Sequence, residues 1–361
     1  MTIRIGLSLD PAMPRFLELA REAERIGVDS VWVAEYWAYD AFTPLAAVAA
    51  VTDRLRLATG IAQLGARTPA MLAMTAQGVQ TLSDGRLILG VGASGPQVME
   101  GWHGVPFDRP VQRTRETIEI IRMIAAGERL AYDGSVHHLP LPGGAGRAIR
   151  SRADTAPIPV YIAALGPANL RLTGELADGW IGNSFFPATA NVFFDPIRAG
   201  AEQAGRSFAD VDRVVAVGVE FTDDDPDAIA AAGRRHADGY AFMFGAMGSA
   251  KKNFYNDAFA RQGYGDDVAE VQRLWTAGNR EAAAARVPIE IGLGTNLVGP
   301  PAAIEDRLVE YERSGVTTLR VGVDGSFDDK ITTLETLVAL TARAGAQFDR
   351  ERRTTESGTT A

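Results

Sequence analysis

The chain has 361 residues, of which 46% are hydrophobic and 22% charged, a balance typical of soluble globular proteins. Its 36 Lys and Arg against 45 Asp and Glu give a formal charge of -9, which argues against a nucleic-acid or anionic-membrane partner. Cysteine is absent, so disulfides, thiolate metal sites and a cysteine nucleophile are excluded. Neither a leader segment nor a membrane-length apolar run is recognisable, and we expect a cytoplasmic protein.

Short apolar runs predict eight strands, and amphipathic stretches predict a helix after most of them. The strands carry few polar interruptions, as in sheets buried on both faces, and cover residues 3–9, 30–34, 57–61, 86–91, 160–163, 179–182, 213–221 and 318–323. The helices carry apolar residues at helical spacing and cover residues 14–26, 44–51, 69–82, 109–126, 169–176, 190–204, 226–238, 301–313 and 329–344.

Residues 56–96 hold the clearest unit of this pattern. Thr68 suits a helix N-cap and Pro69 the first helical position, where no amide donor is missed. Residues 83–85, Ser-Asp-Gly, end that helix, and the next strand runs into the glycine-rich residues 92–95. A parallel strand, a crossover helix and a second parallel strand form one right-handed unit, with ligands at the carboxyl ends of the strands.

Two insertions and a tail interrupt the alternation. Residues 128–159 contain a hairpin turn at 132–135, and residues 240–287 read as further helix with breaks at Gly245, Gly248 and Gly263. Residues 346–361 are polar, and we expect them to be disordered. The pattern predicts an α/β protein with a single (β/α)8 TIM barrel domain over residues 1–345; a doubly wound open sheet is the alternative.

Small residues follow two of the predicted strands. Residues 92–95, Gly-Ala-Ser-Gly, and residues 165–169, Leu-Gly-Pro-Ala-Asn, leave backbone amides uncovered near a chain reversal, an arrangement that binds phosphate without a cation. Either loop alone could simply be a tight turn, and neither matches a Walker or dinucleotide-binding pattern. With two such loops on neighbouring strands, an anionic cofactor site and a pair of simple tight turns stand as equal alternatives.

Other common kinds of site are disfavoured. His137 and His138 are adjacent, so in a strand they point to opposite faces and cannot form a pair of metal ligands. The sequence contains neither H-E-x-x-H nor the G-x-S-x-G elbow of serine hydrolases. We therefore expect no metal and no serine nucleophile.

Three segments carry a family resemblance. They are WVAEYW, LATGIAQLGARTPAMLAMTAQGVQTLSDGRLILGVGASGPQVMEGWHG and PVYIAALGPANLRLTGELADGWI. Over about residues 3–345 the chain resembles the bacterial luciferase-like superfamily. More narrowly it is similar to coenzyme F420-dependent oxidoreductases, including methylenetetrahydromethanopterin reductase and F420-dependent glucose-6-phosphate dehydrogenase. The resemblance implies a luciferase-like TIM barrel, a deazaflavin across its carboxyl face, a small-molecule substrate and a homodimer.

The resemblance also implies positions for the site. Glu35 and Tyr36 match the pair that flanks the tricyclic ring, and Gly60 and Ile61 match a non-prolyl cis peptide that backs it. The residues that match the cofactor-holding loops, or lie beside them, are Gly92, Ala93, Ser94, Gly95, Ala163, Ala164, Leu165, Gly166, Gly182 and Asn183.

Two departures narrow the expected chemistry. Several relatives have Asp-His where this chain has Glu35-Tyr36, and Gly95 stands where the dehydrogenase has an acidic residue. The resemblance therefore favours an F420-dependent reductase of an imine or activated alkene over a sugar-phosphate dehydrogenase. Tyr36 polarised by Glu35 is one candidate proton donor and Glu35 itself another, although Glu35 could instead form a structural salt bridge. An FMN-dependent monooxygenase and a non-catalytic cofactor-binding barrel remain the alternatives.

Overall fold

The computed structural model describes residues 2–247 and 253–358. Eight parallel strands follow one another around a closed barrel: β1 (Arg4–Ser8), β2 (Ser30–Val33), β3 (Arg56–Thr59), β5 (Leu87–Gly92), β8 (Val160–Ala163), β9 (Gly179–Gly182), β10 (Asp212–Phe221) and β12 (Thr318–Val323). The first strand pairs with the last, with Ile5 opposite Leu319, and this pairing closes the sheet. These are the eight strands predicted from the sequence. The TIM barrel is confirmed and the open-sheet alternative is wrong.

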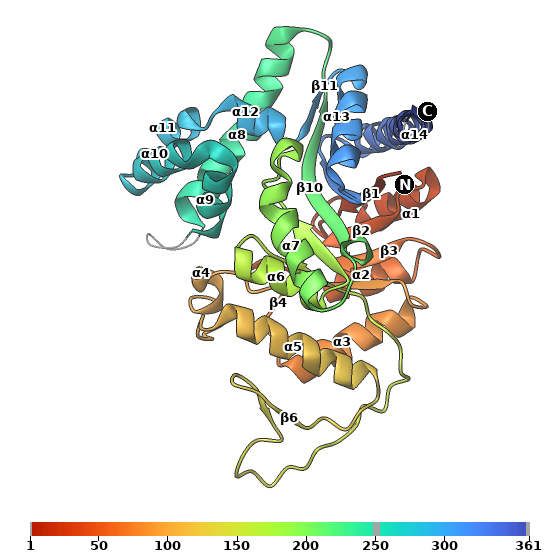
Figure 1. Ribbon diagram of the computed structural model, residues 1–361, viewed down its shortest axis with the longest axis vertical. Coiled ribbons are helices and arrows are strands. Elements are labelled where there is room, and N and C mark those ends of the chain that lie inside the picture. Colours follow the sequence, from red (N-terminus) through yellow and green to blue (C-terminus); the bar gives the residue numbers. More distant parts are fainter. Residues whose placement is uncertain (1, 248–252, 359–361) are drawn as a thin grey trace.

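Helices surround the barrel (Figure 1). Those that match the predicted helices are α1 (Phe16–Ile26), α2 (Phe42–Ala49), α3 (Pro69–Leu82), α5 (Pro110–Ala125), α6 (Pro167–Leu176), α7 (Asn191–Gln203), α8 (Pro226–Ala246), α13 (Pro301–Ser314) and α14 (Phe327–Gly358). The predicted start of α3 is confirmed in detail, because the Thr68 side chain accepts a hydrogen bond from the Met71 amide at 3.2 Å. Within the described residues, no helix is both long enough and apolar enough to span a membrane.

Side chains alternate between two cores along the strands. Outward-facing residues such as Leu7, Val31 and Leu57 are fully buried beneath the helices. Inward-facing residues fill the barrel itself and form a separate cluster of Trp32, Ala58, Ile88, Tyr161, Ile181 and Val214. This period-two alternation is the geometry of any strand. It decides which side chain of each strand can reach the site.

Several short elements were not predicted from the sequence, among them β4 (Ala62–Gln63), α4 (Pro96–Met99), α12 (Ile289–Gly294) and β11 (Leu297–Gly299). Each is too short for hydrophobic periodicity to be visible. β4 pairs with the carboxyl end of β5, and β11 pairs with the carboxyl end of β10. Both therefore extend the barrel rim above the last residues of the neighbouring strands.

The helical insertion is more continuous than predicted. α8 runs to Ala246 rather than residue 238, and α9 (Phe254–Phe259), the π-helical turn η3 (Ala260–Tyr264), α10 (Gly265–Thr276) and α11 (Arg280–Arg286) follow. The predicted break at Gly245 is wrong: a Cβ there would lie 2.1 Å from Trp275, so this glycine lets α10 pack closely. Gly263, with φ 100°, does break the helix, and Gly248 lies outside the described residues. In Figure 1 this group stands beside the barrel.

The carboxyl-terminal helix is also longer than predicted. We expected disorder from residue 346, whereas α14 continues to Gly358; residues 359–361 lie outside the described residues. Leu334, Leu337 and Leu340 anchor the helix in the core. Beyond them Ala344 is buried and Arg343 pairs with Glu305 at 3.0 Å, so contacts that the sequence does not reveal hold the helix where disorder was expected to begin.

Residues 128–159 contain an antiparallel pair, β6 (Tyr132–Asp133) and β7 (His138–Leu139), as the predicted hairpin requires. The buried carboxylate of Glu116, on α5, accepts hydrogen bonds from the Ser135, Val136 and His137 amides at 2.7–2.9 Å. Burial alone would raise the pKa of Glu116. The hydrogen bonds from Gln112 and from these amides outweigh it and lower the pKa to about 2.

Replacing Glu116 should therefore loosen the hairpin. We expect Glu116→Gln to lower the free energy of unfolding by about 1–3 kcal/mol, because amides that now bond to a charged acceptor lose it. The folded-state pKa lies below the ordinary value of 4.5, so this stabilisation is present above pH 4.5 and is lost as the pH falls towards 2.

Urea denaturation at pH 7 and pH 3 would measure both effects. The exposed Glu128→Gln is the matched control and should leave stability unchanged. A Glu116→Gln deficit of equal size at both pH values would contradict the assignment.

Candidate functional site

The predicted loops meet at one end of the barrel. They follow β2, β3, β5, β8 and β9, which are consecutive around the barrel although they span residues 34 to 184 of the chain. Because all eight strands are parallel, their carboxyl ends lie on the same rim. The closed sheet therefore brings the loops at residues 35–36, 60–61, 92–95, 163–166 and 182–183 together.

The segment after β3 lies at the centre of this rim. The Gly60–Ile61 peptide is cis, as predicted. The Gly60 amide donates to the Val33 carbonyl at 2.7 Å, and the Ile61 carbonyl accepts from the Glu35 amide at 3.2 Å. Ile61 packs on the inward core, and a Cβ on Gly92 would lie only 3.1 Å from its side chain. The loops after β2, β3 and β5 are thus in direct contact.

Glu35 is held in place on all sides. One carboxylate oxygen forms an ion pair with Arg67 at 2.7 Å, and the other accepts from the Gln63 amide at 2.9 Å. The Gln63 side chain donates back to the Glu35 carbonyl at 2.8 Å and also contacts His103 at 2.8 Å. Arg67 in turn lies over the Phe42 ring at 5.0 Å. The structural salt bridge that the sequence left open is therefore present.

Tyr36 has a different environment. Its side chain is 60% exposed and lies edge-on to Trp37, with ring centroids 6.3 Å apart. In the described parts of the chain no hydrogen bond joins Tyr36 to Glu35, because both Glu35 oxygens face Arg67 and Gln63. The prediction that Glu35 polarises Tyr36 is therefore wrong. The tyrosine hydroxyl remains open to the barrel mouth.

The loops after β5 and β8 have room for a ligand. Ser94 adopts a left-handed conformation with φ 60°, and Gly95 is the N-cap of α4. Gly166 begins α6, and a Cβ added there would meet nothing within 4 Å. Ala164 is less available, since it is buried and its carbonyl accepts from the Trp180 indole at 2.8 Å. The free space lies over the glycines.

Arg261, which the sequence did not single out, stands beside this space. It belongs to η3, and its guanidinium donates to the Leu165 carbonyl at 2.5 Å. Burial lowers its pKa, but a guanidinium remains charged at neutral pH. The helical insertion thus brings a cation to a loop that would hold an anion. Only the fold reveals this, because 96 residues separate Leu165 from Arg261.

The end of β9 meets the same insertion. Gly182 is the last residue of β9, and Asn183 hydrogen-bonds to the hydroxyl of Tyr255 on α9. Burial raises the pKa of Tyr255, and the Asn183 bond opposes that shift. The Gln262 side chain donates to the Ser184 carbonyl at 2.7 Å. These contacts hold the insertion against the barrel mouth.

Arg320 on β12 was also missed. Its guanidinium donates to the Gly60 carbonyl at 3.0 Å from inside the barrel. Burial lowers the pKa of Arg320, and the nearby Tyr36 and Tyr255 oppose that shift. The sequence does carry a signal, an arginine in the middle of the apolar run TLRVGV. No recognisable motif includes this arginine, so the sequence alone does not assign it to the site.

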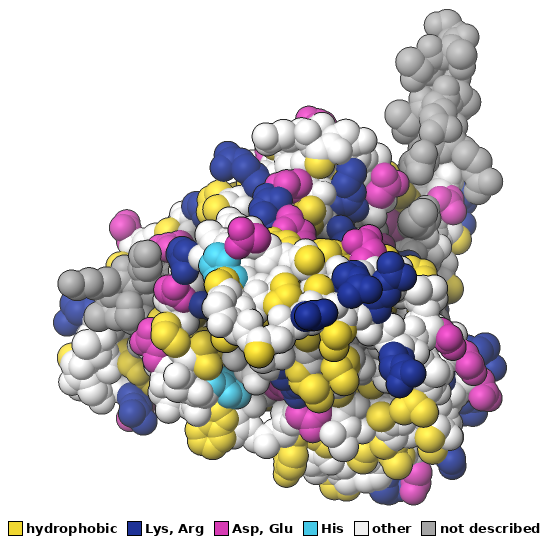
Figure 2. Space-filling view, turned by 90° about the horizontal axis from the view of Figure 1, so that it is seen from below, with side chains coloured by type: hydrophobic (Ala, Val, Ile, Leu, Met, Phe, Trp, Pro, Cys, Tyr) yellow, Lys and Arg dark blue, Asp and Glu magenta, His cyan; other side chains and the backbone are white. Residues whose placement is uncertain are grey.

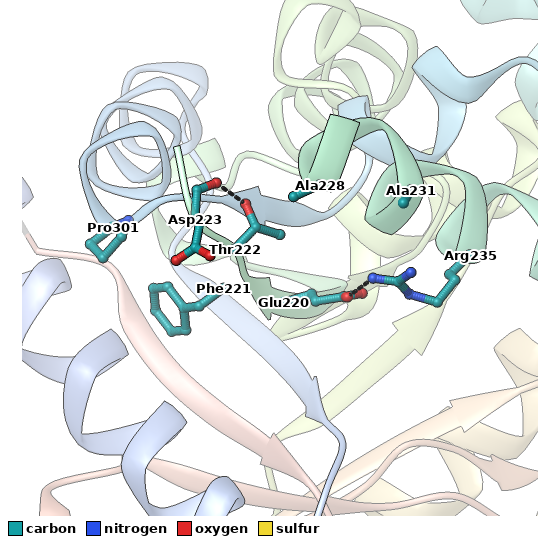
Figure 3. A pocket seen from close by; sticks show the side chains of 8 residues that line it. All are labelled: Glu220, Phe221, Thr222, Asp223, Ala228, Ala231, Arg235 and Pro301. Atoms are coloured by element: carbon teal, nitrogen blue, oxygen red, sulfur yellow. Dashed lines mark hydrogen bonds and ion pairs between the residues drawn. The ribbon is translucent and has the colours of Figure 1, made fainter. Parts of the chain in front are cut away.

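A second depression lies away from these loops. Figure 3 shows that Glu220, near the end of β10, is paired with Arg235 of α8, and that Thr222 and Asp223, just after β10, also line this depression. None of the predicted site residues lines it. The Glu220 carboxylate also pairs with His236 at 3.2 Å, so Glu220 already has partners within the depression. We place the candidate site at the barrel mouth.

The chain matches a known family over most of its length. The sequence model of the luciferase-like monooxygenases covers residues 2–318. The chain belongs to the luciferase-like family.

Figure 2 shows that one face of this luciferase-like protein mixes hydrophobic, basic and acidic side chains.

Two relatives bear on the cofactor. A putative coenzyme F420-dependent oxidoreductase of Mycobacterium tuberculosis is 38% identical over 84% of this chain and 89% of the relative. A 5,10-methylenetetrahydromethanopterin reductase of Archaeoglobus fulgidus is 28% identical over 89% of this chain and 93% of the relative. Both alignments span nearly the whole barrel.

Solved structures support the fold. The F420-dependent tetrahydromethanopterin reductase of Methanopyrus kandleri has a TM-score of 0.76 at 23% identity, covering 94% of this chain and 98% of that one. An oxygenating constituent of 3,6-diketocamphane monooxygenase from Pseudomonas putida, in complex with FMN, has a TM-score of 0.67 at 19% identity, covering 95% and 98%. The luciferase-like barrel is therefore common to F420- and FMN-associated proteins.

The Glu35–Arg67 pair should contribute measurably to stability. Their side chains are only 7% and 19% exposed, so each single variant leaves a poorly solvated partner. We expect Glu35→Gln and Arg67→Gln each to lower the free energy of unfolding by about 1–3 kcal/mol, and the double variant to cost at least about 1 kcal/mol less than their sum.

A double-mutant cycle by chemical denaturation measures this coupling. The exposed Arg273–Glu270 pair has the same 2.7 Å separation and should give a coupling near zero. Additive effects at Glu35 and Arg67 would show that the pair is not an energetic unit.

Proposed function

We propose that the protein is a coenzyme F420-dependent oxidoreductase that transfers a hydride between the deazaflavin and a small organic substrate. We favour reduction of an imine or an activated alkene. The single observation that carries this proposal is the open, glycine-lined rim after β5 and β8 with Arg261 beside it, in a chain 38% identical to a putative F420-dependent oxidoreductase. A phosphate-bearing cofactor suits that combination of backbone amides, space and charge.

The residues present fit the cofactor. The phosphate would lie over Gly95 and Gly166, where there is space beyond the backbone, with Ser94 and Arg261 within reach of it. The ring would lie against Ile61, whose side chain is fixed between Gly92 and the inward core. Asn183 and Tyr255, where the helical insertion meets the barrel mouth, would limit the entry of water into the site.

The deazaflavin supplies two-electron hydride transfer and reacts little with oxygen, so the protein's own task is to orient the reactants and deliver one proton. Both carboxylate oxygens of Glu35 are engaged by Arg67 and Gln63, so neither is directed at a substrate. The Tyr36 hydroxyl is free at the mouth, and we assign it the role of proton donor. Glu35 then acts by fixing the loop that carries Tyr36.

We further propose that the protein is a cytoplasmic homodimer. The outer surface of α3 exposes Met71, Met74 and Leu82, each more than half accessible to solvent. Exposed apolar side chains on one helix face suit burial against a second copy. The dimer would leave the barrel mouth of each copy free.

F420 should bind and FMN should not. We expect low-micromolar binding of F420 in a fluorescence titration, because the loop at Gly166 is open and a relative that is 38% identical over 84% of this chain is named for F420. Gly166→Ala, whose Cβ would enter the free space, should weaken F420 binding about tenfold or more without changing the melting temperature.

Gly146→Ala is the matched control, since that glycine lies in the hairpin insertion with equally open surroundings. FMN binding without F420 binding would instead support the monooxygenase alternative. F420 binding without turnover on a panel of imines and enones would support a non-catalytic barrel.

Loss of the Tyr36 hydroxyl should impair the chemical step. We expect Tyr36→Phe to lower kcat about 100-fold or more while F420 affinity stays nearly unchanged, because proton delivery is lost and the aromatic surface is kept. Steady-state kinetics together with the binding titration separate the two effects. Trp37→Phe, which alters the neighbouring ring without removing a hydroxyl, is the control. Full activity of Tyr36→Phe would assign the proton to another group.

A further inference from the structure

Arg320 is a charged side chain in the interior of the barrel. On β12 its neighbours Leu319 and Val321 are buried in the outer core, so Arg320 faces inward by the alternation of the strand. In the sheet it lies beside Gly6 of β1 and Ala216 of β10. The Trp32 and Ser30 side chains fill the space beside Gly6, and the glycine that makes room for the guanidinium is Gly60.

The charge of this guanidinium is poorly balanced by the protein. One N–H donates to the Gly60 carbonyl, while the buried Nε has no hydrogen-bond partner. In residues 2–247 and 253–358 no carboxylate forms an ion pair with Arg320, and the ionisable groups that act on it are the hydroxyls of Tyr36 and Tyr255. A desolvated cation without an anion is costly. A ligand with an electron-rich group would offset that cost.

The position of β12 indicates which part of the ligand reaches Arg320. In the ring of eight strands, β12 lies directly opposite β5, whose loop is the proposed phosphate site together with that of β8. A cofactor with its phosphate there and its ring against Ile61 points its far end towards β12. Gly60 is part of the same contact, since a Cβ on it would lie 2.6 Å from the Arg320 guanidinium.

We propose that Arg320 binds the pyrimidinedione end of the cofactor ring and stabilises the negative charge of its reduced form. Hydride transfer breaks a C–H bond of one reactant and forms a C–H bond on the other. A bound ring that accepted a hydride would gain two electrons and one proton, hence one negative charge, and Arg320 would lie beside the pyrimidinedione end that shares it. When it returns the hydride to an imine or alkene that charge leaves with it, and the substrate takes a proton from Tyr36.

This inference rests on the proposed function and concerns a residue that would contact the cofactor in the same site. It predicts that Arg320 contributes differently to the binding of the oxidised and the reduced cofactor. Arg320 should favour the reduced cofactor over the oxidised one, because a charge-assisted hydrogen bond to an anion is stronger than one to a neutral carbonyl.

The test compares the affinity of oxidised and reduced F420 for the intact protein by anaerobic equilibrium dialysis. In Arg320→Gln the affinity for reduced F420 should fall about tenfold or more beyond any fall for oxidised F420. Arg320→Lys, which keeps the charge with fewer donors, should restore part of the difference. Arg56→Gln removes a half-buried cation at the other end of the barrel, where Arg56 pairs with Asp29 at 2.6 Å, and should leave the ratio unchanged.

An equal loss for both redox states, or no loss, in Arg320→Gln would overturn the inference. If that variant does not fold, the ratio measured in Arg320→Lys decides: an unchanged ratio overturns the inference and a lower one supports it. If the native protein binds FMN and not F420, the proposed function fails on its own. The same comparison with oxidised and reduced FMN still tests Arg320, because both rings share the pyrimidinedione end.

Discussion

Pairing between β1 and β12 is the constraint on which the rest of the structure depends. It joins the two ends of a chain segment more than 300 residues long and turns an open sheet into a barrel. Because every strand is parallel, closure gathers all the strand ends on one rim and places Arg320 across the mouth from the loop after β5. A site built from residues 35 to 320 exists only in the closed sheet.

Inside the closed barrel, glycines allow side chains to lie close to the backbone. Gly60 makes room for the Arg320 guanidinium, and Gly92 makes room for Ile61. Gly166 differs, because its surroundings are open and the space it leaves is available to a ligand. The rim thus combines positions where glycine permits packing with positions where it keeps a cavity free.

Some charged side chains at the rim stabilise the fold, whereas others lie beside the proposed ligand space. Glu35 and Arg67 neutralise each other and hold the loop after β2 against the loop after β3. Arg261 and Arg320 have no such carboxylate partner among the described residues, and both direct their donors towards backbone carbonyls beside the proposed ligand space. An acidic protein that keeps two such cations at one mouth is suited to an anionic ligand.

The sequence by itself determined the eight strands, most of the surrounding helices, the cap at Thr68 and the segments that form the rim, because these depend on local periodicity and on the chemistry of individual residues. Only the tertiary structure decided that Glu35 is neutralised by Arg67 rather than paired with Tyr36, and that Arg261, Tyr255 and Arg320 join the site. It also showed that Gly245 lies within a helix, packed against Trp275. Such contacts link residues tens to hundreds of positions apart, and neither spacing nor propensity encodes which distant partner a side chain meets.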